Sequence, residues 1–161
     1  MSERHRQGSC PDSGPGHTDG HGHGDGDGNF RWPVRVYYED TDAAGIVYYA
    51  NYLKFMERAR TEWLRWRGFE QRDLTREHGL LFVVSRLDIR YLEPARLDDR
   101  LDVEVEVTRL GRAGFDMRQH VINEQGSPLC AGDITIACLD AQRMKPCAIP
   151  TVLLTELRRE N

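Results

Sequence analysis

The residues best suited to chemistry lie together in the stretch VYYEDTDAAGIVYYANYLKF, residues 36–55. Three carboxylates occupy four positions, at Glu39, Asp40 and Asp42, and aromatic residues then run into a segment with a helical pattern. A carboxylate can attack a carbonyl carbon, or activate a water molecule that does so. The free N–H groups and the positive dipole end of a helix N-terminus can stabilise the oxyanion that results.

Two interpretations of this stretch stay open on residue types and spacing alone. In the first, one acid acts on a carbonyl held at the helix start, while Gly45 lets the backbone approach the ligand closely. The side chains of Tyr48, Tyr49 and Tyr52 would then exclude water. In the second, the acids lie there only because negative charge complements the helix dipole.

Several other catalytic patterns are missing from the sequence. It contains no GxSxG, no GxxxxGK[ST], no GxGxxG after a predicted strand and no HExxH. His78 and His120 stand alone in the folded part, so we expect surface or packing roles for them. The absence of these patterns argues against a Ser-His-Asp hydrolase and against a metal hydrolase. We expect neither a metal nor another cofactor.

The elements that position the acidic stretch follow from the hydrophobic period. Residues 31–38 are predicted to form a strand, and the apolar spacing from about Ala50 predicts a long helix that ends near Gly68. Its apolar stripe consists of Tyr52, Phe55, Met56, Ala59, Trp63 and Trp66. A second helix at 71–78 is followed by strands at 81–94, 101–107, 114–122 and 129–140 and by a short helix at 150–159. Short turns between the late strands require antiparallel pairing, which predicts an α+β domain with the sheet wrapped on the long helix.

Composition limits the class of protein. The 161 residues suit one domain, and a net charge of −4 with a pI near 5.9 gives no footprint for nucleic acid. We find no apolar run long enough for a membrane span and no signal peptide. We expect a cytoplasmic protein, in which the four cysteines, at positions 10, 130, 138 and 147, are free thiols.

The first 29 residues differ from the rest of the chain. They hold eight of the fifteen glycines and four of the six histidines, and they contain almost no large aliphatic residue. Such a stretch cannot bury a core, so we expect a disordered tail at 1–29 and a folded domain at 30–161. The alternative is weak binding of a divalent metal by His17, His21 and His23 with nearby aspartates.

Three long motifs resemble a known family. Residues 31–64, RWPVRVYYEDTDAAGIVYYANYLKFMERARTEWL, are similar to hotdog-fold acyl-CoA thioesterases of the 4-hydroxybenzoyl-CoA thioesterase type. The similarity is greatest to the bacterial thioesterases associated with the Tol–Pal system. FVVSRLDIRYLEPARLDD (82–99) and ACLDAQRMKPCAIP (137–150) resemble the same group. The resemblance implies a long central helix wrapped by a curved antiparallel sheet, in homodimers or homotetramers.

The resemblance also implies roles for individual residues. Asp42 matches the catalytic carboxylate, as nucleophile or general base, and the backbone N–H of Tyr49 matches the group that polarises the thioester carbonyl. Gly45 and Tyr48 belong to the same substrate-binding loop. Arg112, with Arg109 nearby, matches residues that grip the nucleotide of coenzyme A, although a solvated turn arginine is the alternative for Arg112.

The expected function is therefore hydrolysis of an acyl-CoA thioester to a free acid and coenzyme A. Two alternatives are open: a thioesterase for acyl carrier protein, and a non-catalytic binding or scaffold protein of envelope assembly. One helix cannot cover a whole sheet and its free edge, so we also expect the subunits to pair.

Overall fold

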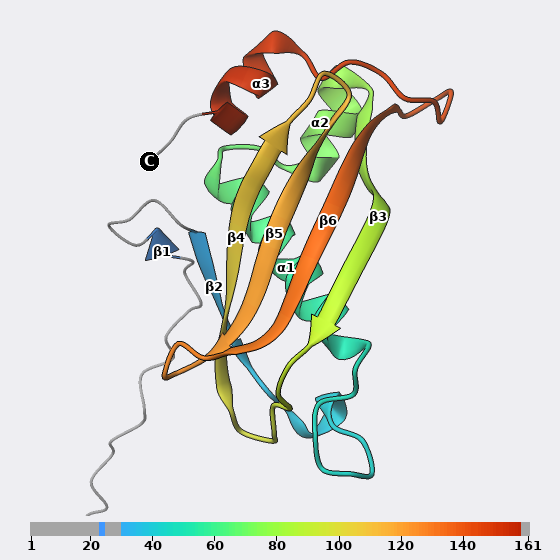
Figure 1. Ribbon diagram of the computed structural model, residues 1–161. Helices are drawn as coiled ribbons and strands as arrows, with labels where there is room; N and C mark the ends of the chain where they lie inside the picture. Colours follow the sequence, from blue (N-terminus) through green and yellow to red (C-terminus); the bar gives the residue numbers. More distant parts are fainter. Residues whose placement is uncertain (1–22, 25–29, 159–161) are drawn as a thin grey trace, which may run out of the picture.

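The computed structural model describes residues 23–24 and 30–158. In chain order its elements are β1 (His23–Gly24), β2 (Phe30–Arg35), a 3₁₀ turn (Tyr38–Asp40), α1 (Asn51–Trp66), α2 (Gln71–His78), β3 (Leu80–Tyr91), β4 (Arg100–Leu110), β5 (Gly114–Asn123), β6 (Pro128–Asp140) and α3 (Thr151–Arg158). All strands belong to one antiparallel sheet in the order β1-β2-β4-β5-β6-β3. Figure 1 shows α1 lying along one face of this sheet. The predicted α+β architecture is confirmed.

The expected tail is described at two residues only. His23 and Gly24 pair with Arg31 and Phe30 as the short edge strand β1. The other residues of 1–29, including Cys10, His17 and His21, lie outside the described residues, so disorder and weak metal binding there stay predictions.

The apolar stripe of α1 is confirmed except at its end. Tyr52, Phe55, Met56, Ala59 and Trp63 are all buried against the sheet. Trp66 is 38% exposed instead, because it is the last residue of α1 and only part of its ring is covered. Phe30 lies against that ring at 5.6 Å and the guanidinium of Arg67 lies 4.7 Å from its centre. Gly68 then takes a left-handed φ of 88° and ends the helix as predicted.

Two predicted strands end earlier than expected, both near the acidic stretch. The strand predicted at 31–38 stops at Arg35, since Tyr38–Asp40 form a 3₁₀ turn. The strand predicted at 81–94 stops at Tyr91, because the N–H groups of Leu92 and Glu93 both donate to the carbonyl of Leu129 and leave the regular ladder.

A buried thiol gives the fold a testable dependence on pH. Cys130 is fully buried on β6, and burial raises its pKa from 9.0 to about 11. Below about pH 9 the thiol is protonated in both states, whereas between about 9 and 11 it ionises only in the unfolded chain. The contribution of the thiol to stability is therefore fully present below about pH 9 and is lost as the pH rises from there through about 11. We expect Cys130→Ala to destabilise the protein less at pH 11 than at pH 8 in urea unfolding; an equal loss at both values would contradict this.

Candidate active site

The Asp42 loop is a tight turn that fixes one carboxylate in solvent. The N–H of Asp42 donates to the carbonyl of Ile46, and the N–H of Gly45 donates to the carbonyl of Asp42, both at 2.9 Å. Gly45 has a φ of 73°, which a residue with a side chain adopts only with strain. Oδ1 of Asp42 accepts a hydrogen bond from the N–H of Ala44 at 2.8 Å. Within the described residues the second carboxylate oxygen accepts none, so it is available to a ligand.

Asp40 has a different environment and supports the loop. It is only 6% exposed, and its Oδ2 accepts a hydrogen bond from the N–H of Tyr37 at 2.9 Å. Its carbonyl accepts from the N–H of Tyr48 at 2.8 Å and from Nδ2 of Asn51 at 3.0 Å. Asp40 therefore joins the 3₁₀ turn, the Asp42 loop and the first residue of α1, while Glu39 lies exposed.

The backbone N–H of Tyr49 lies just before the start of α1. Among the described residues it donates to no acceptor, and the side chain is 59% exposed. The carbonyl of the same residue accepts a hydrogen bond from the hydroxyl of Tyr91, at the end of β3, at 3.1 Å. The backbone at Tyr49 is thus held in place while its N–H stays free for a ligand oxygen.

The tyrosines do not wall off water within one chain. Tyr48 is 44% exposed, and a hydrogen bond with the phenol of Tyr49 raises its pKa. Tyr52 is buried beneath the loop instead, where its hydroxyl accepts a hydrogen bond from the N–H of Ala95 at 2.9 Å. Burial raises the pKa of Tyr52 and of Tyr91, so these phenols keep their protons well above neutral pH. Of the three tyrosines expected to exclude water, Tyr52 supports the loop from below, whereas Tyr48 and Tyr49 are exposed.

The two arginines expected to grip coenzyme A lie at the other end of the sheet. The Asp42 loop follows β2, whose last residue Arg35 pairs with Arg100 at the start of β4. Arg112 lies in the turn after Leu110, at the far end of β4. An 11-residue strand spans about 35 Å, so one chain does not bring Arg112 to its own Asp42.

The two arginines also differ from each other. Nε of Arg109 donates to Oδ2 of Asp116 across the β4–β5 ladder at 2.7 Å, and this arginine lowers the pKa of the carboxyl. Arg112 has an exposed side chain, and its carbonyl accepts from the N–H of Ile149 at 2.8 Å. Arg112 is therefore the freer of the two for an anionic ligand.

Two positioning residues were missed by sequence reasoning. Asn51 and Tyr91 hold the backbone on either side of the Tyr49 N–H, through their bonds to the carbonyls of Asp40 and Tyr49. The role of Asn51 could have been inferred, since an asparagine side chain at a helix start commonly forms a hydrogen bond with a nearby backbone group. Nothing in the alternation of the strand around Tyr91 marks its contact with the loop.

Metal and membrane features are limited in the described part of the chain. Within residues 23–24 and 30–158, no three His, Cys, Asp or Glu side chains are grouped so that they could hold a metal ion. No helix among the same residues is both long and apolar enough to cross a membrane.

Comparison with protein families shows which family the chain belongs to. The Thioesterase superfamily matches residues 44–130, more than half of the chain. The chain belongs to the Thioesterase superfamily. Among superfamily relatives, "Acyl-CoA thioester hydrolase YbgC" of Escherichia coli is 43% identical over 130 residues, which cover 81% of this chain and 96% of that protein. "Acyl-CoA thioesterase YbgC" of Haemophilus influenzae is 48% identical over 121 residues, covering 75% and 88%.

Solved structures of the superfamily agree with the fold. A probable thioesterase from Bartonella henselae superposes with a TM-score of 0.71 at 36% identity, covering 74% of this chain and 98% of the other. A gentisyl-coenzyme A thioesterase, BH1999, superposes with a TM-score of 0.69 at 26% identity, covering 76% and 98%. The family resemblance and the hotdog fold expected from the sequence are confirmed.

Proposed function

We propose that this acyl-CoA thioester hydrolase uses the Asp42 carboxylate for attack and the Tyr49 N–H as its oxyanion donor. The reaction is R–CO–S–CoA plus water to R–COOH plus HS–CoA. The observation that carries the proposal is the pairing, on one fixed loop, of a carboxylate oxygen and an N–H that both lack a partner within the described residues. Such groups can act at once on a carbonyl placed between them.

Either chemical route uses the same carboxylate. As a nucleophile, Asp42 would form a mixed anhydride and expel the coenzyme A thiolate, and water would then cleave the anhydride. As a general base, it would take a proton from water while that water attacks the carbonyl. Negative charge develops on the carbonyl oxygen in both routes, where the Tyr49 N–H and the α1 dipole would stabilise it. Gly45 and Tyr48 would line the thioester at this loop.

An exposed apolar strip on the edge strand β3 supports pairing with a second copy. In the part of the chain that the structure describes, β3 is an edge strand that pairs with β6 alone. Val84, Leu87 and Tyr91 lie opposite the buried residues Ile136, Ile134 and Cys130, so they point to the α1 face. They are nevertheless 45%, 41% and 48% exposed. We propose that a second copy pairs along β3 and covers this strip.

Such a pair would also complete the site. A symmetric dimer that pairs β3 with β3 must run the two strands antiparallel about a two-fold axis. The Tyr91 end of one copy, beside Tyr49, then lies next to the Leu80 end of the other. The Leu80 end and the Arg112 turn lie at the same end of the sheet, since β3 and β5 both pair with the last part of β6. Arg112 of one copy thus approaches Asp42 of the other, which one chain alone does not allow.

Pairing through β3 predicts a defined effect of charge on this strip. We expect wild-type protein to be at least a dimer at micromolar concentration by light scattering, and Leu87→Glu to be monomeric with activity at least tenfold lower, because like charges would then meet across the interface. Val152→Glu is the matched control, since Val152 is an exposed apolar residue too but lies on α3. An 18.5 kDa wild-type monomer, or a fully active monomeric variant, would contradict the shared site.

Arg112 is proposed to bind the coenzyme A phosphates, with Arg109 as a weaker contributor because of its bond to Asp116. We expect Arg112→Ala to raise KM roughly tenfold and to change kcat little, because a remote phosphate contact binds substrate and transition state alike. The effect should shrink at high salt. Arg72→Ala, on the exposed side of α2, is the control. An unchanged KM at low salt would return Arg112 to the role of a solvated turn residue.

Two alternative functions, an acyl-carrier-protein thioesterase and a non-catalytic scaffold, make different demands on the site. Acyl carrier protein presents its acyl group on the same pantetheine arm, so matched acyl-CoA and acyl-carrier-protein thioesters must be assayed side by side. A non-catalytic scaffold would need neither the free carboxylate oxygen nor the free N–H.

We propose a cytoplasmic enzyme, since the three described cysteines are free thiols.

A further inference from the structure

After β6 the chain turns and returns along the end of that strand. Leu139 and Pro146 form an antiparallel bridge, and the N–H of Cys147 donates to the carbonyl of Cys138 at 3.0 Å. Residues that share such a bond lie opposite each other, with their Cα atoms roughly 5.5 Å apart. Cys138 and Cys147 therefore form a cross-strand pair, and their sulfur atoms are 3.7 Å apart.

The geometry of this pair fits a disulfide. Bridged cysteines have Cα atoms about 4.4–6.8 Å apart and sulfur atoms about 2.05 Å apart. The backbone of the pair already lies in this range, so the two sulfur atoms need to approach each other only by about a further 1.7 Å. Cys130 cannot take the place of Cys147, because eight residues of strand put it about 27 Å from Cys138.

The two thiols differ in access and in acidity. Cys138 is fully buried, and burial, followed by the hydrogen bond with Cys147, raises its pKa to about 12. Cys147 is half-buried between the exposed residues Pro146 and Ala148, so a small oxidant in solvent reaches it first. Reversible oxidation of such a pair also suits the proposed cytoplasmic enzyme, because disulfides in that compartment are mostly transient.

We propose that hydrogen peroxide joins Cys138 and Cys147 in a reversible disulfide and that this bond shifts the Arg112 turn. The sulfur of Cys147 attacks one peroxide oxygen, the O–O bond breaks, and a sulfenic acid and water result. The sulfur of Cys138 then attacks the sulfenic sulfur, an S–S bond forms, and a second water molecule leaves. Each sulfur gives up one electron, and these two electrons reduce the peroxide.

Both cysteines are close to backbone bonds that hold the Arg112 turn. The N–H of Cys138 donates to the carbonyl of Ala113 at 2.9 Å, and the N–H of Ile149, two residues after Cys147, donates to the carbonyl of Arg112 at 2.8 Å. Movement of Cys147 toward Cys138 therefore displaces the backbone from which the Arg112 side chain extends. The effect on substrate rests on the proposed role of Arg112 in binding coenzyme A.

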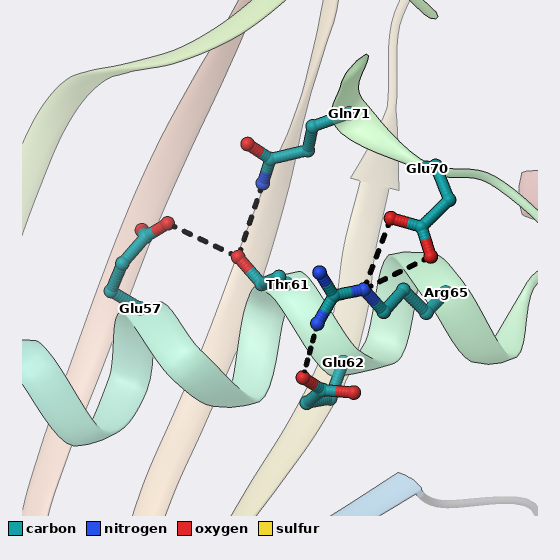
Figure 2. Close-up of polar contacts among 6 residues, drawn as sticks. All are labelled: Glu57, Thr61, Glu62, Arg65, Glu70 and Gln71. Atoms are coloured by element: carbon teal, nitrogen blue, oxygen red, sulfur yellow. Dashed lines mark hydrogen bonds and ion pairs between the residues drawn. The ribbon is translucent and has the colours of Figure 1, made fainter. Parts of the chain in front are cut away.

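We expect the effect to stay local to the turn. Figure 2 shows that the start of α2, at the same end of the sheet, is fixed to α1 through side chains, for example by the Gln71 amide, which donates to the Thr61 hydroxyl at 3.1 Å. The returning segment is attached by the backbone bonds of Cys147 and Ile149 instead. A new bond between the sulfur atoms thus changes this segment without breaking the contact between the helices.

Peptide mapping of the full chain tests the disulfide. Wild-type protein is treated with hydrogen peroxide, free thiols are blocked, and the digested peptides are identified by mass spectrometry, which separates the bond from oxidation of the exposed Met144. We expect a Cys138–Cys147 bridge that dithiothreitol reverses and that forms at least about tenfold faster than any bridge to Cys10 or Cys130, since neighbouring thiols react within one molecule. If both cysteines stay free thiols, or if Cys147 proceeds to a sulfinic acid without a bridge, the proposal is overturned.

Steady-state kinetics test the effect on the Arg112 turn. We expect oxidation to raise KM for an acyl-CoA about two- to tenfold with little change in kcat, because a displaced Arg112 loses at most the binding that its removal would cost. Cys147→Ser should not respond to peroxide. Cys130→Ala is the matched control, a buried thiol of the same strand, and should respond as wild type does. In Arg112→Ala the bridge should form and leave KM unchanged.

These outcomes separate the disulfide from the proposed function. If the bridge forms and wild-type KM does not change, although Arg112→Ala raises KM, the link between the disulfide and the turn is overturned. If no acyl-CoA is hydrolysed, or if Arg112→Ala leaves KM unchanged, the proposed function or the proposed role of Arg112 fails. The peptide map then still decides whether Cys138 and Cys147 form the disulfide.

Discussion

Replacing Asp42 by asparagine is expected to lower kcat for an acyl-CoA thioester about 10²- to 10⁴-fold and to change KM little. Asparagine keeps the shape of the side chain and can still accept the hydrogen bond from Ala44 that fixes the loop. It removes the negative oxygen needed to attack the carbonyl or to take a proton from water. Steady-state release of coenzyme A thiol measures the loss, with circular dichroism and light scattering to verify fold and dimer.

The neighbouring acids are the internal controls for this prediction. Glu39→Gln should have little effect, because Glu39 is exposed and lies outside the network that holds the loop. Asp40→Asn should fall between the two and should lower Tm, because it weakens the charge-assisted hydrogen bond that the Asp40 carboxylate accepts from the Tyr37 N–H. If folded Asp42→Asn keeps more than about a tenth of wild-type kcat, Asp42 is not the catalytic carboxylate.

The three acids of the opening stretch thus have three different environments. Asp40 is buried and joins the loop to the helix, and Glu39 is exposed. Asp42 is held in solvent, and one of its carboxylate oxygens has no hydrogen-bond partner among the described residues. The residue types alone do not reveal these differences in environment. The family motif separated Asp42 from Asp40, but the hydrogen bonds that separate them physically come from folding the loop against α1.

Much of the fold was predictable because its signals are local. The helical spacing from Tyr52 to Trp63 and the strict alternation at Leu101, Val103 and Val105 each predict the buried face correctly. Strand ends were less predictable. They depend on single contacts such as the shared carbonyl of Leu129, which no hydrophobic period encodes.

The arrangement of the site was not predictable from local pattern. Asp42 and Arg112 lie far apart in the sequence, and only the register of β2, β4 and β5 reveals that they lie at opposite ends of the sheet. The contact of Tyr91 with Tyr49 joins residues that are 42 positions apart, which requires the complete sheet. The exposed strip on β3 likewise becomes visible only when α1 is placed.

In the proposed dimer, each active site combines Asp42 of one copy with Arg112 of the other. Co-expression of an Asp42→Asn chain with an Arg112→Glu chain, each with its own affinity tag, yields heterodimers that two affinity steps isolate. Each variant alone should have a kcat/KM at least about tenfold below wild type.

The decisive measurement is the kcat/KM of the purified heterodimer at low substrate concentration. If the site is shared, one of its two sites has both intact residues, and activity should be about half that of wild type. If each chain built its own site, every site would carry one defect, and activity should be at most about a twentieth. The shared site predicts the first value, and the second would contradict it.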